Sequence, residues 1–174
     1  MAYFAELDAD NNVVNVAFLH NILTMTDEGE EDETIGATRF APSEEGNRWI
    51  RCSWNMSGGV HATGKTPFRA NYPSIGWVYS AEHDIFHPSA AKDHWDNPAP
   101  NHTLNTTTGL WEAPIPEPEL TDDDIANGSY YYWDQAVYDA DTSDPKTEGW
   151  VKFAVTHTIW SEDDAVWPEG EGPE

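Results

Sequence analysis

The sequence is poor in basic residues, cysteine and long apolar runs, and each shortage argues against a class of protein. Eight Lys and Arg stand against 32 Asp and Glu, so the 174-residue chain has a formal net charge of −24 at pH 7. A field of this sign repels phosphate backbones and anionic lipid, so we expect no nucleic acid and no membrane as partners. The single cysteine, Cys52, excludes an internal disulfide framework. We expect neither a transmembrane segment nor a signal peptide.

Aliphatic residues are also scarce, whereas aromatic residues are abundant. The chain has nine Trp, seven Tyr and six Phe, and aromatic side chains bury large areas in cores and at interfaces. We therefore expect an aromatic-rich core, because tryptophan is highly buried on average. The alternative is an exposed platform for stacking sugars, for which the candidates are Trp77, Trp95, Trp111 and Trp133.

Apolar segments that flank clusters of turn-forming residues predict a series of antiparallel hairpins. Residues 1–19 contain YFAEL, then DADNN, then VVNVAFL, which is typical of a β-hairpin. Three later segments follow the same plan, in which Ser, Asn or Asp comes directly after a strand and bonds to the turn backbone. They are WVYSAEHDIFHP, HTLNTTTGLWEAP and YYWDQAVYDAD, the last with a long loop before Trp150.

The segments between these hairpins predict a further strand, extended arms and little helix. RWIRCSW, residues 48–54, indicates a strand with one buried face and with Arg48 and Arg51 pointing outward. One helical turn is expected before Pro42 and another after Thr121. The proline-rich segments HPSAAKDHWDNPAP and EAPIPEPEL predict extended backbone. The acidic residues 161–174 are expected to be mobile unless a tryptophan docks them.

The expected fold class is therefore mainly β. Antiparallel hairpins would form a small sheet or sandwich core, with extended proline-rich arms and at most short helices. We expect three parts along the chain. They are an N-terminal β core over residues 1–76, hairpin repeats with proline-rich arms over residues 77–118, and a C-terminal hairpin with the acidic tail over residues 119–174.

The segment GVHATGKT, residues 59–66, matches the phosphate-binding loop pattern. A working phosphate loop follows a buried strand and opens a helix, whose N-terminal amides bind the phosphate. Here Pro67 follows at once, and FRANY, which separates it from Pro73, has no helical stripe of apolar residues. We therefore expect a glycine-rich turn between strands, and no nucleotide cofactor.

Two metal-binding patterns fail a similar test of context. HDIFH, residues 83–87, resembles the zinc-protease motif, but that motif works only on a helix and this segment is expected to form a hairpin. DADNN, residues 8–12, begins like a calcium loop but lacks its glycine and glutamate, so only an adventitious cation is expected. We expect no dedicated metal and no enzymatic activity. A structural zinc site stays open as an alternative, with the ligands drawn from His83, His87, His94 and His102.

Four segments of the chain form a characteristic series. They are MAYFAELDADNNVV, SWNMSGGVH, RANYPSIGWVYSAEHDIFHPS and HTLNTTTGLWEAPIPEP. Over them the chain resembles small acidic proteins encoded by tailed phages of marine bacteria, especially cyanophages. It departs from the group at Ala70, at Pro73-Ser74 and at His87. The resemblance implies a virion-associated protein and assigns no catalytic residue.

We therefore expect a non-enzymatic virion structural protein that is made in the host cytoplasm. The first choice is a capsid decoration protein that binds the major capsid protein, present in many copies. The alternative is a tail or fibre module that binds a host-surface glycan, and a regulator that binds a basic host protein also stays open. Lys65 and the nearby arginines form one candidate docking patch, unless they are ordinary strand-edge charges. The expected interface residues are Arg48, Arg51, Arg69, Tyr72, Trp77, Trp95, Trp111 and Trp133.

Overall fold

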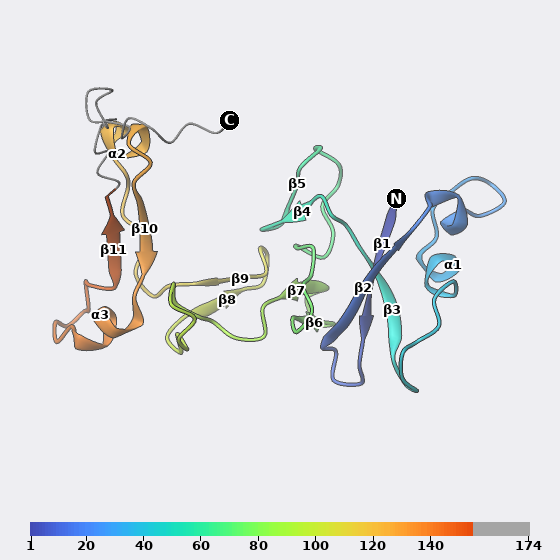
Figure 1. Ribbon diagram of the computed structural model, residues 1–174, viewed down its shortest axis with the longest axis horizontal. Coiled ribbons are helices and arrows are strands. Elements are labelled where there is room, and N and C mark those ends of the chain that lie inside the picture. The colour runs from blue at the N-terminus through green and yellow to red at the C-terminus, as the bar shows by residue number, and fades with distance from the viewer. Residues whose placement is uncertain (155–174) are drawn as a thin grey trace, which may run out of the picture. The chain divides into compact units, whose positions relative to one another are not determined.

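A computed structural model describes residues 1–154, which form paired strands and a few short helices (Figure 1). The chain divides into two compact units, Met1–Pro114 and Ile115–Glu174, of which the second is described as far as residue 154. All strands in the described part pair antiparallel, and its three α-helices have five or six residues each. The expected mainly β fold with at most short helices is confirmed. The three-part division of the chain stays a prediction.

The first unit is built on a three-stranded sheet in the order β2-β1-β3. The strands are β1 (Ala2–Leu7), β2 (Val13–Leu19) and β3 (Arg48–Cys52). The first two form the hairpin expected for residues 1–19, with a bulge between Glu6 and Leu7. The central strand β1 is covered on both faces, so five of its six residues are buried. A strand covered on both sides loses the simple alternation of apolar and polar residues.

The two faces of this sheet bury separate clusters. Ala5 and Leu7 lie in a cluster with Phe86, which comes from a later hairpin. Phe4 lies in the other cluster with Trp49, and Phe40 stacks on Trp49 from the segment after α1 (Glu33–Ala37). The short η1 (Asn21–Thr24) precedes α1 and contacts it.

The expectation that β3 has one buried face is wrong. Trp49 is buried in one cluster and Cys52 in the other, on opposite faces of the strand. The reason is that Ala37 and Phe40 cover the face that carries Trp49, while Phe86 belongs to the cluster on the face that carries Cys52. Arg48 remains exposed, whereas Arg51 is half-buried. Burial also raises the pKa of the Cys52 thiol to about 12.

A buried carboxylate connects β1 to the chain before β3. The Glu6 carboxylate is inaccessible to solvent, and it accepts hydrogen bonds from the Ser43 backbone N–H and the Asn47 amide. Burial raises the pKa of Glu6, but these hydrogen bonds outweigh burial, so its pKa lies below the usual value. Charge-assisted bonds of this kind hold residues 43–47 against the sheet.

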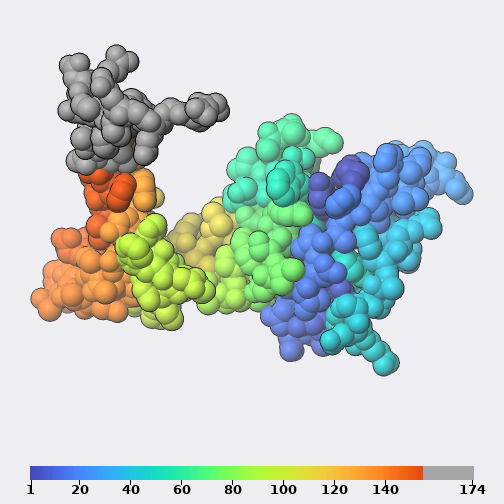
Figure 2. Space-filling model, in the orientation of Figure 1, coloured from blue at the N-terminus to red at the C-terminus, as the bar shows by residue number. Residues whose placement is uncertain are grey.

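Three small hairpins follow the sheet in the first unit. They are β4 (Met56–Ser57) with β5 (Val60–His61), β6 (Val78–Ser80) with β7 (Ile85–His87), and β8 (Thr103–Asn105) with β9 (Leu110–Glu112). In the space-filling view, the teal and green surface of residues 56–87 lies against the blue surface of the sheet (Figure 2). The two hairpins expected from residues 77–88 and 102–114 are confirmed, with Tyr79 opposite Phe86 and Leu104 opposite Trp111.

The segments that match the phosphate-loop and zinc-protease patterns form strands and turns, as the sequence predicts. Residues 59–66 supply β5 and the turn that follows it, and no helix begins between residues 62 and 77. Residues 83–87 form a turn and β7, so His83 and His87 do not share a helix face. Within residues 1–154 no group of three His, Cys, Asp or Glu side chains is placed to hold a metal ion.

The second unit pairs β10 (Tyr130–Trp133) with β11 (Trp150–Phe153). The helical turn expected after Thr121 is α2 (Asp122–Ala126), and Thr121 closes a capping box with Asp124. The connection between β10 and β11 contains a helix, α3 (Gln135–Ala140), that the sequence analysis expected to be hairpin and loop. Trp133 is buried and packs against Trp150. The expected mobility of the acidic residues 161–174 concerns residues outside the described part.

Candidate functional site

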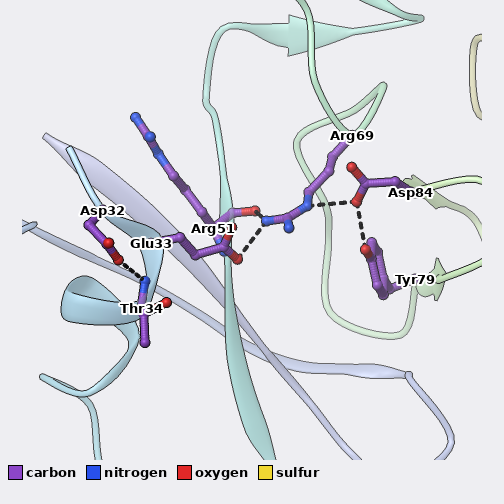
Figure 3. Close-up of polar contacts among 7 residues, drawn as sticks. All are labelled: Asp32, Glu33, Thr34, Arg51, Arg69, Tyr79 and Asp84. Atoms are coloured by element: carbon purple, nitrogen blue, oxygen red, sulfur yellow. Dashed lines mark hydrogen bonds and ion pairs between the residues drawn. The ribbon is translucent and has the colours of Figure 1, made fainter. Parts of the chain in front are cut away.

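The first unit has one charged network that joins three elements (Figure 3). The Arg69 guanidinium donates to Glu33 of α1 at 2.8 Å and to Asp84 of the β6–β7 turn at 2.9 Å. It also donates to the Arg51 carbonyl of β3 at 2.5 Å. Tyr79 donates its hydroxyl hydrogen to the same Asp84 carboxylate at 2.5 Å. The network therefore connects the helix, the sheet and the hairpin through one side chain.

The backbone around Arg69 is unusual, and burial shapes the charge of its side chain. Arg69, Ala70 and Asp84 all have positive φ, of 54°, 51° and 51°, a conformation that costs an L-residue about 1 kcal/mol or more. Burial lowers the pKa of the guanidinium, but the hydrogen bonds and charges of Glu33 and Asp84 outweigh it. The pKa of Arg69 therefore lies above its usual value, and the side chain stays charged.

We expect the Arg69→Met substitution to destabilise the first unit by about 2 kcal/mol, because it removes three charge-assisted hydrogen bonds from a side chain that is only 14% exposed. The figure is smaller than the roughly 3–5 kcal/mol lost when a fully buried ion pair is broken, since Glu33 and Asp84 keep contact with water. Urea unfolding followed by tryptophan fluorescence measures the change.

The matched control is the Lys92→Met substitution. Lys92 pairs with Asp96 at 2.6 Å, but both side chains are well exposed. Exposed pairs contribute about 0.5 kcal/mol or less. Equal losses of stability in the two variants would contradict the central role of Arg69.

A polar cleft of about 390 Å³ lies beside this network. Arg51 lines it and forms an ion pair with Glu31, which also accepts a hydrogen bond from the Asn21 amide at 2.8 Å. The Arg51 guanidinium lies 5.6 Å from the centre of the Phe68 ring, a cation–π contact. The complete lining is Met1, Asn21, Glu31, Arg51, Ser53, Asn55, His61, Lys65, Thr66 and Phe68.

Four aromatic side chains of the first unit gather into one group, and we call them the aromatic face: Tyr3, Phe18, Trp54 and Tyr72. Tyr3 lies at the centre, with ring centroids 5.9 Å from Phe18, 6.5 Å from Trp54 and 5.6 Å from Tyr72. Trp54 is 66% exposed and Phe18 is 59% exposed. In the chain, Trp54 stands between Ser53 and Asn55, which both line the cleft, although no residue of the aromatic face belongs to that lining.

The eight residues expected to form an interface lie in several places. Arg51, Arg69 and Tyr72 belong to the cleft, the network and the aromatic face. Arg48 lies at the other end of β3 and bonds to Asn11. Trp77 packs on the cluster that contains Phe86.

None of the other three tryptophans of that prediction lines the cleft. Trp95 is exposed in the loop of residues 92–98, Trp111 is half-buried and donates its indole N–H to the Pro88 carbonyl at 2.9 Å, and Trp133 is buried in the second unit. The sequence analysis missed Tyr3, Phe18 and Trp54. One signal in the sequence could have indicated this group: Tyr3 and Phe18 occupy facing positions of the predicted first hairpin.

A buried amide holds the hairpins of the first unit together. Asn71 accepts a hydrogen bond from the Gly58 N–H at 2.7 Å and donates to the carbonyls of Phe86 at 2.9 Å and Thr108 at 2.8 Å. One side chain thus joins the turns or strands of β4–β5, β6–β7 and β8–β9. Asn71 directly precedes Tyr72 of the aromatic face in the chain.

Comparisons of the chain with protein-family models, with curated proteins and with solved structures found no match. Within residues 1–154, no helix has the length and apolar character needed to cross a membrane. The functional argument therefore depends on the cleft, the network and the aromatic face themselves.

Proposed function

We propose that the chain is a non-enzymatic structural protein of a phage virion, and specifically a capsid decoration protein that binds the major capsid protein. The observation that carries this proposal is the aromatic face, where Trp54 and Phe18 expose most of their side chains. Tyrosine, tryptophan and phenylalanine are enriched at the centres of protein interfaces. The resemblance to virion-associated phage proteins supplies the kind of partner.

The aromatic face is also well ordered for binding. Tyr3 belongs to the central strand β1 and Phe18 faces it from β2, so paired strands fix both rings. Trp54 and Tyr72 contact each other at 5.2 Å between ring centroids. A surface that is fixed before binding loses little conformational entropy on binding. On a symmetric shell, many copies multiply a modest affinity.

Mass spectrometry of purified virions tests this proposal. We expect the protein in the particle at a copy number comparable to that of the major capsid protein. A few copies per particle would instead indicate the tail, and absence from the particle would overturn any role in the virion.

Binding of purified variants to shells that lack the protein tests the surface. Trp54→Ala is expected to weaken binding about 30-fold, as for a central aromatic residue of an interface. Trp95→Ala is the matched control, because Trp95 is 61% exposed but lies apart from the aromatic face. Equal binding by both variants would show that another surface contacts the shell.

A tail or fibre module that binds a host-surface glycan is the second candidate function. The first unit has both an exposed aromatic group and a polar cleft, and this combination favours it, because sugar-binding sites combine aromatic rings with groups that hydrogen-bond to hydroxyls. A glycan array probed with the unaltered chain and the Trp54→Ala variant tests it. Absence of binding to every glycan on the array would count against this candidate.

A further inference from the structure

Lys65 differs from the other lysines and arginines of the chain in its polar contacts. All eight of these residues lie within residues 1–154. The other seven each form an ion pair or hydrogen bond, whereas none is found for Lys65 within the described part of the chain. In a chain with a net charge of −24, acidic partners are abundant, so an unpaired ammonium group at the edge of a cleft is notable. The paired residues are Arg39, Arg48, Arg51, Arg69, Lys92, Lys146 and Lys152.

The remaining charges of the cleft cancel one another. Arg51 is neutralised by Glu31, which accepts from both Arg51 and Asn21. The charged side chains of the lining therefore sum to one positive charge, that of Lys65, when the histidine is neutral. The Thr63 backbone N–H donates a hydrogen bond to Nδ1 of His61, with 3.3 Å between the two nitrogen atoms. Because Nδ1 accepts this bond, the proton of the neutral ring is on Nε2.

The cleft also presents hydrogen-bonding groups of both kinds. The side-chain carbonyl oxygen of Asn21 is buried and has no hydrogen-bond partner, so it is an unused acceptor. Ser53, Asn55 and Thr66 add hydroxyl and amide groups to the same lining. A ligand that both donates and accepts hydrogen bonds at several positions matches this set, and a polyhydroxylated sugar is such a ligand.

The size and charge of the cleft restrict the chemical class of the ligand further. A volume of about 390 Å³ falls within the range of small-molecule sites and exceeds what a simple ion needs. The unpaired ammonium group of Lys65 balances one carboxylate, whereas a multiply charged phosphate would face the strongly negative field of the chain.

We propose that this cleft binds a sugar residue carrying a single carboxylate, with the Lys65 ammonium paired to the carboxylate and the Asn21 carbonyl accepting from a sugar hydroxyl. The inference depends on the glycan-binding candidate and names its sugar class. Trp54 directly follows Ser53 of the cleft lining in the chain, and we expect further sugar units of a longer glycan to stack on its exposed ring.

Isothermal titration of the full chain with methyl β-D-glucuronide and methyl β-D-glucoside tests the proposal, because the two probes differ only in the carboxylate. We expect the glucuronide to bind at least about 10-fold more tightly, since a charge-assisted hydrogen bond contributes more than 1 kcal/mol. The Lys65→Gln substitution is expected to abolish this preference.

Lys92→Gln is the matched control, because Lys92 is an exposed lysine that pairs with Asp96 and does not line the cleft. It is expected to keep the preference for the glucuronide. Thermal unfolding of both variants verifies that the fold is intact, and little change is expected from either surface substitution.

Three results would overturn the assignment. Equal affinity for the glucuronide and the glucoside would reject the carboxylate but leave glycan binding in place. Inorganic phosphate bound as tightly as the glucuronide, and lost with Lys65→Gln, would show a general anion site instead. Failure of the glucuronide to bind at high millimolar concentration would reject the cleft as a sugar site. If the chain nevertheless bound glycans on the array, and Trp54→Ala removed that binding, the aromatic face alone would be the sugar site.

Discussion

The Gly109→Ala substitution is expected to destabilise the first unit by about 4 kcal/mol. Gly109 has φ of +65°, and a Cβ there would lie 2.4 Å from Nδ2 of Asn71 and 2.6 Å from the Phe86 carbonyl oxygen. The left-handed conformation alone costs an alanine about 1 kcal/mol. The rest comes from overpacking and from displacing the Asn71 amide from its hydrogen bonds. Urea unfolding monitored by tryptophan fluorescence gives the free energy.

Gly64→Ala is the matched control for this prediction. Gly64 has a similar φ of +71°, but nothing lies within 4 Å of the position where a Cβ would be. The expected loss is therefore only the conformational cost of about 1 kcal/mol. A Gly109→Ala variant no less stable than Gly64→Ala would show that the junction around Asn71 is loosely packed.

The Asn71→Asp substitution is expected to destabilise the first unit by about 4 kcal/mol at pH 7, although it changes the shape of the side chain very little. Asn71 is buried and donates to the Phe86 and Thr108 carbonyls. An aspartate cannot donate when ionised, so the change leaves two carbonyls unpaired and directs a carboxylate at them. Each such loss costs about 1–3 kcal/mol.

Circular dichroism during urea unfolding measures this loss, with Asn127→Asp as the control. Asn127 is exposed at the end of α2 in the second unit, and no side-chain hydrogen bond is found for it in the described structure. The same chemical change there is expected to alter stability by about 0.5 kcal/mol or less. A similarly small effect at Asn71 would mean that the three hairpins are held by apolar packing, without need of the amide.

Local sequence patterns predicted the hairpins because each one depends on a short segment. The turn residues Asp8 and Asn105 accept hydrogen bonds from backbone N–H groups two to four residues later, as expected. Asp134 accepts from Ala136 and Val137 in a similar way, but there it caps α3. The same side-chain geometry begins a turn or a helix, so the local pattern alone did not separate the two outcomes.

The candidate site was much less predictable, because its contacts join residues far apart in the sequence. Arg69 reaches Glu33 across 36 positions, and Asn71 reaches Thr108 across 37. The left-handed backbone at Arg69 and Ala70 is stabilised by these distant contacts and has no local signal such as glycine. The sequence analysis did not select Trp54, because its exposure depends on how the distant residues Tyr3 and Tyr72 pack beside it.

The burial of Cys52 has a practical consequence for locating the partner. With a thiol pKa of about 12, almost none of this cysteine is thiolate at neutral pH, and its side chain is inaccessible. It is the only cysteine in the chain, so the native protein is inert to maleimides. A Trp54→Cys or Lys65→Cys variant therefore carries a single reactive handle, and a photo-crosslinker attached there marks whichever molecule touches the aromatic face or the cleft inside an assembled particle.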